Sequence, residues 1–270
     1  MKKKCIITGA NSFVAKYLKN EFVSKNWQVI LLSSSKYDEN YFNLKEPNTI
    51  NSNIFKNTDL LIHCAYDFKL TRWEDIFNTN VIGSFELFKI ANKYKVKKII
   101  NISTLSAFEN AKSKYGKAKY LIEQKSKHYN VINIRCGLFN DKNSKIFSKF
   151  LWISNKLKIC PMIGNGKYYL HICNLKYLFE EIIYLINLKK DLEIYYSGTK
   201  RKYYLKDIIK FLSNDKIIFV YIPLSLITLI LKLFGYLRIS LGFNYDNLLG
   251  LINYNDKIEI DDKSKHSIYS

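Results

Sequence analysis

Residues 4–15 read KCIITGANSFVA, and this stretch decides the fold class. A short apolar run leads into a turn at Gly9, after which apolar residues recur at the spacing of one helix face. A buried strand that passes through a tight turn into a helix begins a βαβ unit. Gly9, Ser12 and Ala15 stand where such a turn needs small residues to admit a phosphate at the helix N-terminus. Because only one of the three is Gly, the turn by itself fits a dinucleotide site or an ordinary strand–helix turn.

The same alternation continues along the first half of the chain. Short apolar runs predict strands and longer amphipathic stretches predict helices. The strands are expected at 27–32, 60–64, 98–103 and 131–136, and the helices at about 72–94 and 114–129. Strands that read as continuous apolar runs are typical of a parallel sheet covered on both faces. The sequence therefore predicts an α/β protein with a Rossmann-type, doubly wound parallel sheet.

After Gly137 the pattern is looser but still alternates. Strands are expected near 158–162, 193–196 and 216–221, and helices at about 175–188, 203–212 and 223–237. We expect a dinucleotide-binding domain over 1–137, with returning segments near 165–200. A smaller C-terminal α/β lobe that binds substrate is expected over 138–164 and 200–255, followed by a polar tail at 256–270.

The chain has 270 residues and a formal charge of +20, from 43 Lys and Arg against 23 Asp and Glu. Such a balance raises nucleic acid or an anionic surface as a partner. Only four of the basic residues are Arg, and Lys, Asn, Ile and Tyr are abundant together. Because these four residues have A/T-rich codons, we attribute much of the charge to a solvated lysine surface. The sequence has no stripe of interleaved basic and aromatic residues that would indicate a nucleic-acid partner. An anionic ligand or an anionic surface stays open as the partner of the remaining charge.

The number and spacing of the cysteines indicate the redox environment of the protein. The five cysteines are odd in number, none is spaced as CxxC, and each has apolar neighbours. This pattern favours reduced, buried thiols in a cytoplasmic protein and no metal site. No apolar segment follows Met1 that could serve as a secretion signal.

Two polar segments could carry chemistry. Tyr115 and Lys119 are four residues apart, so a helix places both on one face, where an ammonium favours the phenolate. In a chain with 21 Tyr and many more Lys, such a pair also arises by chance. Hydroxyls at 103–106 follow a predicted central strand, and ligands bind at strand carboxyl ends. Ordinary capping by Ser and Thr explains that segment equally well.

Taken together and in order, these segments resemble the extended short-chain dehydrogenase/reductase family, whose members include nucleotide-sugar epimerases, dehydratases and reductases. The resemblance covers nearly the whole chain. It rests on TGANSFVA at 8–15, HCAYD at 63–67, NTNVIGS at 78–84, ISTLSAF at 102–108, YGKAK at 115–119, IRCGLF at 134–139, GNGKYYLHICNL at 164–175 and YSGT at 196–199.

The resemblance implies a catalytic set. Tyr115 would be the acid/base, and Lys119 would bind the nicotinamide ribose and lower the pKa of Tyr115. Thr104 would polarise a sugar carbonyl or hydroxyl, with Ser103 and Ser106 as nearby substitutes. Hydride transfer at a sugar carbon would accompany the proton transfer.

The resemblance also implies a set of cofactor-binding residues. Gly9, Ser12, Phe13 and Val14 would line the pyrophosphate. Asn43 and Leu44 would meet the adenine, Ala65 would lie near the cofactor ribose, and Asn80 would be structural beneath the site. Three residues depart from the family pattern: Ser12 replaces a Gly, Tyr66 replaces a small residue and Cys136 replaces a Pro.

The end of the second strand bears on cofactor choice. An acid there would bind the ribose 2′-OH of NAD, whereas a cation accommodates the phosphate of NADP. The chain offers Ser33, Ser34 and Lys36, with no acid before Asp38. We therefore expect NADP in preference to NAD, although an ordinary polar loop would look the same.

The expected reaction is reduction of a nucleotide-linked keto-sugar for surface polysaccharide. Family dehydratases carry acids after the catalytic hydroxyl, whereas Leu105 and Ser106 follow Thr104 here. A nucleotide-sugar epimerase that retains NAD and a catalytically inactive nucleotide-binding relative are the alternatives. We also expect a homodimer. The apolar helix at 223–237 either closes over the sugar pocket, forms an oligomer contact or makes weak contact with a membrane surface.

Overall fold

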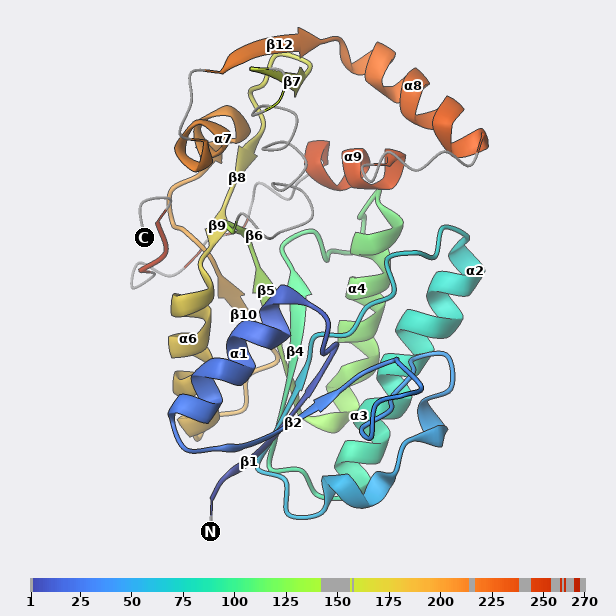
Figure 1. Cartoon of the computed structure of the whole chain (residues 1–270), viewed down its shortest axis with the longest axis vertical. Coiled ribbons are helices and arrows are strands. Elements are labelled where there is room, and N and C mark those ends of the chain that lie inside the picture. Colours follow the sequence, from blue (N-terminus) through green and yellow to red (C-terminus); the bar gives the residue numbers. More distant parts are fainter. Residues whose placement is uncertain are drawn as a thin grey trace.

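A six-stranded parallel sheet forms the centre of the molecule (Figure 1). The computed structural model describes residues 2–141, 156, 158–213, 217–237, 244–253, 258, 260 and 265–267. The strands run in the order β10-β5-β4-β3-β1-β2, and each neighbouring pair is parallel. Their bounds are β1 Lys4–Thr8, β2 Gln28–Leu32, β3 Leu60–His63, β4 Lys98–Thr104, β5 Val131–Cys136 and β10 Ile194–Ser197. The predicted doubly wound sheet is confirmed.

Helices cover both faces of the sheet (Figure 1). Helices α1 (Phe13–Ser24) and α6 (Leu175–Asn187) pack against each other on one face. On the other face lie α3 (Gly83–Lys93) and α4 (Lys114–Ser126). Successive strand side chains point to opposite faces, so Cys5 and Ile7 join the core under α1 whereas Ile6 joins the core under α3. This alternation, with both faces apolar, explains the continuous apolar runs in the sequence.

The helix predicted over 72–94 is three segments. The short helix α2 (Trp73–Ile76) passes into a π-helical turn, η3 (Phe77–Ile82), and then into α3. π-Helical turns insert an extra residue per turn and are common beside functional sites. Three short 3₁₀ segments complete this half of the chain: η1 Pro47–Thr49, η2 Ser52–Phe55 and η4 Lys127–Tyr129.

The second half of the chain builds a lobe beyond the carboxyl ends of the strands (Figure 1). Strand β7 (Ile159–Ile163) pairs in parallel with β12 (Ile218–Ile222). Two further ladders pair short strands: β6 Leu138–Phe139 with β9 Ile172–Cys173 in parallel, and β8 Tyr169–Leu170 with β11 Tyr203–Tyr204 antiparallel. The lobe helices are α7 Leu205–Leu212, α8 Leu224–Tyr236 and α9 Tyr245–Ile252. The elements expected after Gly137 are therefore present.

The C-terminal segment is docked where the structure describes it. Ile258 and Ile260 are buried and pack against Leu105 and Tyr196. The ring of His266 accepts a hydrogen bond from the amide of Asn174 at 2.9 Å. The expected polar tail thus contributes buried side chains across the carboxyl ends of β4 and β10.

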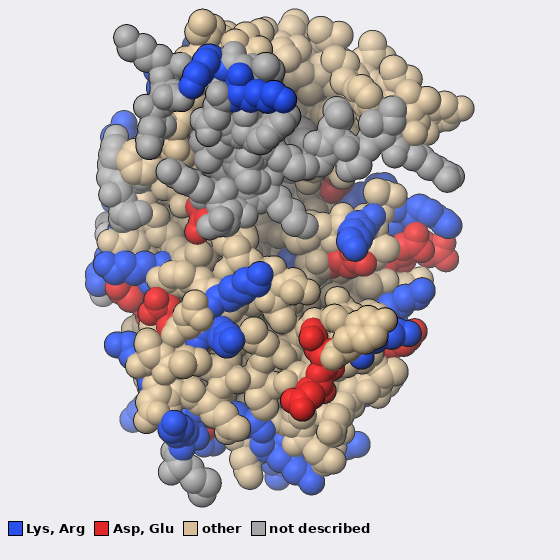
Figure 2. Space-filling view, viewed as in Figure 1, with Lys and Arg blue, Asp and Glu red and all other residues tan. Residues whose placement is uncertain are grey.

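Basic side chains are spread over the face of the molecule that Figure 2 shows. Figure 2 shows Lys and Arg side chains scattered over the sheet domain on the face in view, interrupted by Asp and Glu. Of the five cysteines, four are buried and Cys64 is half-buried, and all are thiols. Within the described ranges, no helix combines the length and apolarity needed to cross a bilayer.

Candidate active site

The three predicted catalytic side chains come together at the carboxyl end of β4. Thr104 is the last residue of β4 and Tyr115 lies in the first turn of α4, and the side chain of Thr104 neighbours the Tyr115 phenol. Lys119 lies one helical turn further along, and its ammonium donates to the carbonyl of Ile102 at 2.7 Å. A phenol, a hydroxyl and an ammonium are therefore placed at the sheet edge where ligands of doubly wound folds bind.

Two caps fix the start of α4, and with it Tyr115. The hydroxyl of Ser113 accepts a hydrogen bond from the amide of Gly116 at 3.0 Å. The carboxylate of Asp246, on α9, accepts from the amides of Lys114 and Tyr115 at 2.6 and 3.1 Å. These amides belong to the first helical turn, which has no partners of its own within the helix. The lobe thus binds the backbone of Tyr115 directly.

The environment of Tyr115 keeps its phenol protonated at neutral pH. Burial raises the pKa of Tyr115, the neighbouring Cys136 raises it further, and the hydrogen bond with Thr104 opposes both. This is the opposite direction from the one expected for a phenol beside Lys119. The phenol is therefore a weaker acid here than in a free tyrosine.

Lys119 is buried, and its charge is destabilised there. Burial lowers the pKa of Lys119 to about 8, whereas Cys64, Glu123 and Cys136 act in the opposite direction. The side chain remains mostly charged at pH 7. Its ammonium lies 5.5 Å from the centre of the Tyr66 ring, within the range of a cation–π contact.

An aromatic cluster covers the Tyr115–Lys119 pair. The ring of Tyr66 meets Tyr115 edge-on at 5.0 Å, and Phe68 lies 4.7 Å from Tyr66 and 5.5 Å from Tyr115. The backbone on either side of Tyr66 is held, because the amide of Ala65 donates to Thr8 and Asp67 is bound by Asn80. The departure noted at Tyr66 therefore places a large ring directly over the catalytic lysine.

Beneath this loop, His63 serves the structure. Its Nδ1 bonds the hydroxyl of Thr8 and its Nε2 bonds the hydroxyl of Ser84, both at 2.8 Å. Ser84 donates its proton to the carbonyl of Asn80, so it accepts from Nε2–H. Burial holds the pKa of His63 well below its ordinary value. The ring is neutral and joins β1, β3 and the start of α3.

Asn80 binds the loop that carries Tyr66. Its side-chain oxygen accepts from the amide of Asp67 at 2.7 Å, and its amide donates to the carbonyl of the same residue at 3.3 Å. Both ends of the Asn80 side chain are thus engaged with backbone. The residue lies under the site, and its contacts explain why the π-helical turn faces the loop.

The turn after β1 has the shape of a phosphate cradle. Gly9 has φ of +76°, and a Cβ there would lie 3.0 Å from backbone atoms of Ala65 and Cys64. The hydroxyl of Ser12 caps α1 by accepting from the amide of Ala15 at 3.1 Å. The capping bond leaves the amides of Phe13 and Val14 at the positive end of the helix. An anionic pyrophosphate fits this turn.

The segment after β2 folds back on itself. Ser33 is buried, and its backbone bonds Asn40 and Phe42 at 3.1 and 2.7 Å. Its hydroxyl accepts from the amide of Ser35, whereas Ser34 and Lys36 are exposed. The residues that reach solvent at this strand end are therefore a hydroxyl and a cation.

Asn43 and Leu44 lie further along the same segment. The side-chain oxygen of Asn43 accepts from the amide of Lys45 at 3.0 Å, and its amide donates to Tyr41 at 3.2 Å. Leu44 is buried, and its backbone lies against Gly83, where no side chain would fit. The pair therefore joins the β2–β3 connection to the start of α3.

A family model supports this fold and site. Residues 5–131 match the model described as the NAD dependent epimerase/dehydratase family. This match spans the glycine turn, the Tyr66 loop, Thr104, Tyr115 and Lys119. Over these residues the chain matches that family.

Solved structures show the same fold as this chain. MoeE5 in complex with UDP-glucuronic acid and NAD superposes with a TM-score of 0.69 at 14% identity, over 82% of this chain and 85% of MoeE5. UDP-N-acetylglucosamine 4-epimerase from Bacillus cereus gives 0.67 at 16% identity, over 93% and 99% of the two chains. UDP-glucose 4-epimerase from Thermotoga maritima gives 0.64 at 17% identity, over 81% and 85%. Comparison with curated protein sequences finds no match.

A buried ion pair behind Lys119 was not predicted from the sequence. Glu123 accepts from Arg135 through a forked contact, with nitrogen–oxygen distances of 2.6 and 3.1 Å, and from Ser103 at 2.5 Å. A signal was present, because Glu123 follows Lys119 by four residues on the helix face that also bears Tyr115. Asp246 gave no signal, since it is 131 residues from Tyr115 in the sequence.

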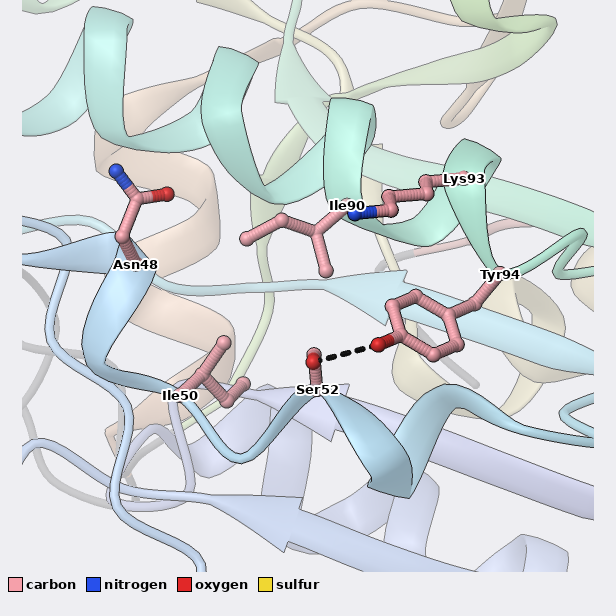
Figure 3. A pocket seen from close by; sticks show the side chains of 6 residues that line it. All are labelled: Asn48, Ile50, Ser52, Ile90, Lys93 and Tyr94. Carbon is pink, nitrogen blue, oxygen red and sulfur yellow. Dashed lines mark hydrogen bonds between the residues drawn. The ribbon is translucent and has the colours of Figure 1, made fainter.

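Two other features lie apart from the chemistry. His171 is buried and its Nδ1 bonds the carbonyl of Thr199, so it is packed between strand ends. A shallow surface pocket lies between the 3₁₀ segments and the end of α3, where Ser52 and Tyr94 are hydrogen-bonded at 2.7 Å (Figure 3). The end of α3 precedes β4, so this pocket is at the opposite edge of the sheet from Tyr115.

Proposed function

We propose that the protein is an NAD(P)-dependent oxidoreductase that acts on a nucleotide-linked sugar, with Tyr115 as its acid/base. The observation that carries the proposal is the placement of Thr104 and Tyr115 as neighbours at the carboxyl end of β4, with Lys119 one helical turn away. The family match and neighbours solved with UDP-glucuronic acid, UDP-glucose and NAD support the substrate class.

The first turn of the chain supports the cofactor. Gly9, Ser12, Phe13 and Val14 would hold the pyrophosphate, because Gly9 brings backbone close and the helix offers amides. When bound, the nicotinamide would exchange a hydride with a sugar carbon. Lys119 would meet the nicotinamide ribose and Ala65 would lie near it, although the ring of Tyr66 must first move aside.

Thr104, Tyr115 and Lys119 would carry out the proton transfer. Thr104 would bind the sugar oxygen and orient it toward the phenol of Tyr115. Tyr115 would donate its proton to that oxygen as the hydride arrives at carbon. The charge on Lys119 would stabilise the phenolate that remains, and this effect is strong in a site from which water is excluded.

We propose reduction of a keto-sugar, for surface polysaccharide, as the specific reaction. The phenol of Tyr115 is protonated at neutral pH, as the proton donor of a carbonyl reduction must be. Leu105 and Ser106 follow Thr104, so no carboxylate stands where family dehydratases carry one.

The test of this reaction is direct. The protein is mixed with NADPH and a nucleotide-linked 4-keto-6-deoxy sugar, and cofactor absorbance is followed. Tyr115→Phe should lower the rate by a factor on the order of a hundred or more, while Tyr120→Phe on the same helix should not. Equal measurable rates for the wild type and Tyr115→Phe would reject Tyr115 as the acid, whereas no cofactor consumption by either protein would favour an inactive nucleotide-binding relative.

The second strand supports a preference for NADP. Ser34 and Lys36 are exposed at its end, beside the buried Ser33, and could meet a 2′-phosphate. Lys36→Glu should weaken NADPH more than NADH in a binding titration. Tighter binding of NADH than NADPH by the wild type would reject the preference.

Epimerisation is the second candidate. Two of the similar structures carry the name of a 4-epimerase, and MoeE5 was solved with NAD. An epimerase retains its cofactor, so mass spectrometry of the purified protein should detect NAD, and plain nucleotide hexoses should interconvert without added cofactor. A cytoplasmic homodimer is our proposal for the working form.

A further inference from the structure

Eight large apolar side chains stand exposed along one continuous stretch of the lobe, the segment 217–237 that contains β12 and α8. They are Ile218, Val220, Tyr221, Leu226, Leu229, Leu233, Tyr236 and Leu237. Leu229 is 64% exposed, Leu233 is 53% exposed and Tyr236 is 85% exposed. Isolated exposed apolar residues are ordinary, but a contiguous patch on a soluble surface marks an interaction site.

The fold does not use this face of α8. Leu226, Leu229, Leu233 and Tyr236 recur at intervals of three and four residues, so they share one side of the helix. Leu224, Ile227 and Leu231 lie on the other side and pack into a cluster with Leu248 of α9. The exposed leucines therefore form a second apolar face, and α9 rather than α8 lies against α4.

Charge around the patch favours an anionic partner. Residues 217–237 contain no acidic residue and one cation, Lys232. The ammonium of Lys232 reaches the ring of Tyr245 at 5.0 Å, and that of Lys210 reaches Phe219 of β12 at 5.7 Å. These lysines lie at the margin of the apolar residues. The upper right of Figure 2, where α8 lies in Figure 1, shows uncharged side chains.

We propose that the exposed face of α8, with the outward residues of β12, docks on an anionic membrane surface. Leucines of a surface helix enter the boundary between headgroups and acyl chains, while flanking lysines meet lipid phosphates. With 13 residues, α8 is too short to span a bilayer and would lie in the plane of the surface.

The inference does not depend on the proposed reaction, and vesicle binding tests it without substrate. The full chain is sedimented with vesicles of phosphatidylcholine alone and with vesicles containing phosphatidylglycerol. The double variant Leu229→Gln, Leu233→Gln should lower the partition coefficient on anionic vesicles by about tenfold or more, because two leucine side chains no longer enter the apolar phase. Lys232→Glu should lower it less and reduce its dependence on salt.

Matched controls come from the sheet domain. Val23 on α1 and Tyr184 on α6 are exposed by 52% and 58%, so Val23→Gln and Tyr184→Gln remove similar apolar surface elsewhere. These variants should bind anionic vesicles as the wild type does. Equal loss in both sets of variants, or equal binding to neutral and anionic vesicles, would overturn the proposal. A dimer that the α8 variants dissociate in light scattering would assign the face to a second copy instead.

Discussion

At Lys119, a charged group is held in the protein interior by a few neighbours. Its ammonium donates a hydrogen bond to the carbonyl of Ile102 and lies over the ring of Tyr66. Burial disfavours the charged form and lowers the pKa of Lys119 to about 8. An unfolded lysine has a pKa of about 10.4. Between these values the folded protein binds fewer protons than the unfolded chain, so the stability linked to Lys119 rises with pH from about 8 to about 10.

Lys119→Met should therefore remove a pH-dependent penalty. At pH 7 both states of the wild type are charged at this position, and burial of the charge costs about 3 kcal/mol by the shift of its pKa. The variant should be more stable relative to the wild type at pH 7 than at pH 10. Urea unfolding of both proteins across this range measures the difference, and parallel pH profiles would contradict it.

The ring of Tyr66 sets the access to Lys119. A cofactor that reaches the ammonium must displace this ring and lose its contacts with Lys119 and Tyr115. Tyr66→Ala should then bind NADPH roughly tenfold more tightly, whereas Tyr66→Phe should bind as the wild type does. Fluorescence titration gives both affinities. Weaker binding by the alanine variant would show instead that the ring contacts the cofactor.

At the scale of elements, α4 depends on the lobe for its first turn. Asp246 supplies a carboxylate to the amides of Lys114 and Tyr115, and a negative charge at a helix N-terminus is stabilising. Substrate binding that shifts α9 would therefore shift the backbone of the catalytic tyrosine. This coupling links the lobe to the chemistry without any contact between Asp246 and the reacting groups.

Asp246→Ala should destabilise the protein by about 1–2 kcal/mol, as the loss of a helix cap does. Hydrogen exchange should speed up at the amides of residues 114 and 115 more than elsewhere. Asp207, in the first turn of α7, provides the control: Asp207→Ala should leave exchange in α4 unchanged. Unaltered exchange at Tyr115 in Asp246→Ala would show that α4 holds its first turn without the lobe.

The role of Ser12 as the N-cap of α1 can be tested with two substitutions that differ in their ability to cap a helix. Ser12→Ala removes the acceptor for the amide of Ala15 and should cost about 1 kcal/mol of unfolding free energy, whereas Ser12→Gly should cost only a few tenths. Thermal unfolding of the two variants measures the difference. Equal losses would mean that the capping bond contributes little and that Ser12 is tolerated for other reasons.

At the scale of the whole molecule, the C-terminal segment closes the sheet edge. Ile258 and Ile260 bury their side chains against Leu105, the residue after Thr104. Replacing both by Ala should destabilise the protein by about 2 kcal/mol per site or more. Ile218→Ala on the exposed part of β12 is the matched control and should change stability little. Equal effects at the three sites would show that the segment is not docked in solution.

Much of the fold could be predicted from local pattern. The parallel strands from β1 to β5 are short apolar runs, and the helices between them are amphipathic, so period and burial alone identify them. The interruption of the helix at Phe77–Ile82 could not be read, because it follows from the contact of Asn80 with the loop at Asp67. The docking of the C-terminal segment is also invisible locally, since its apolar residues are few and lie among charges.

The candidate site divides in the same way. Tyr115 and Lys119 are linked by one helical turn, so spacing alone places them on one face, and Glu123 extends that series. The rings of Tyr66 and Phe68 and the carboxylate of Asp246 come from other elements, and nothing in their own neighbourhood points to Tyr115.

By itself the sequence determined the succession of strands and helices along the chain, the position of the glycine turn and the placement of Tyr115 and Lys119 on one helix face. All of these depend on periodicity or on spacing within one element. Tertiary structure alone decided the protonated state of Tyr115, the lowered pKa of Lys119 and the lobe carboxylate at the start of α4. These properties depend on burial and on groups brought together across long separations in the chain. Only the packing of the whole molecule determines how far a side chain is removed from water and which charged group lies beside it.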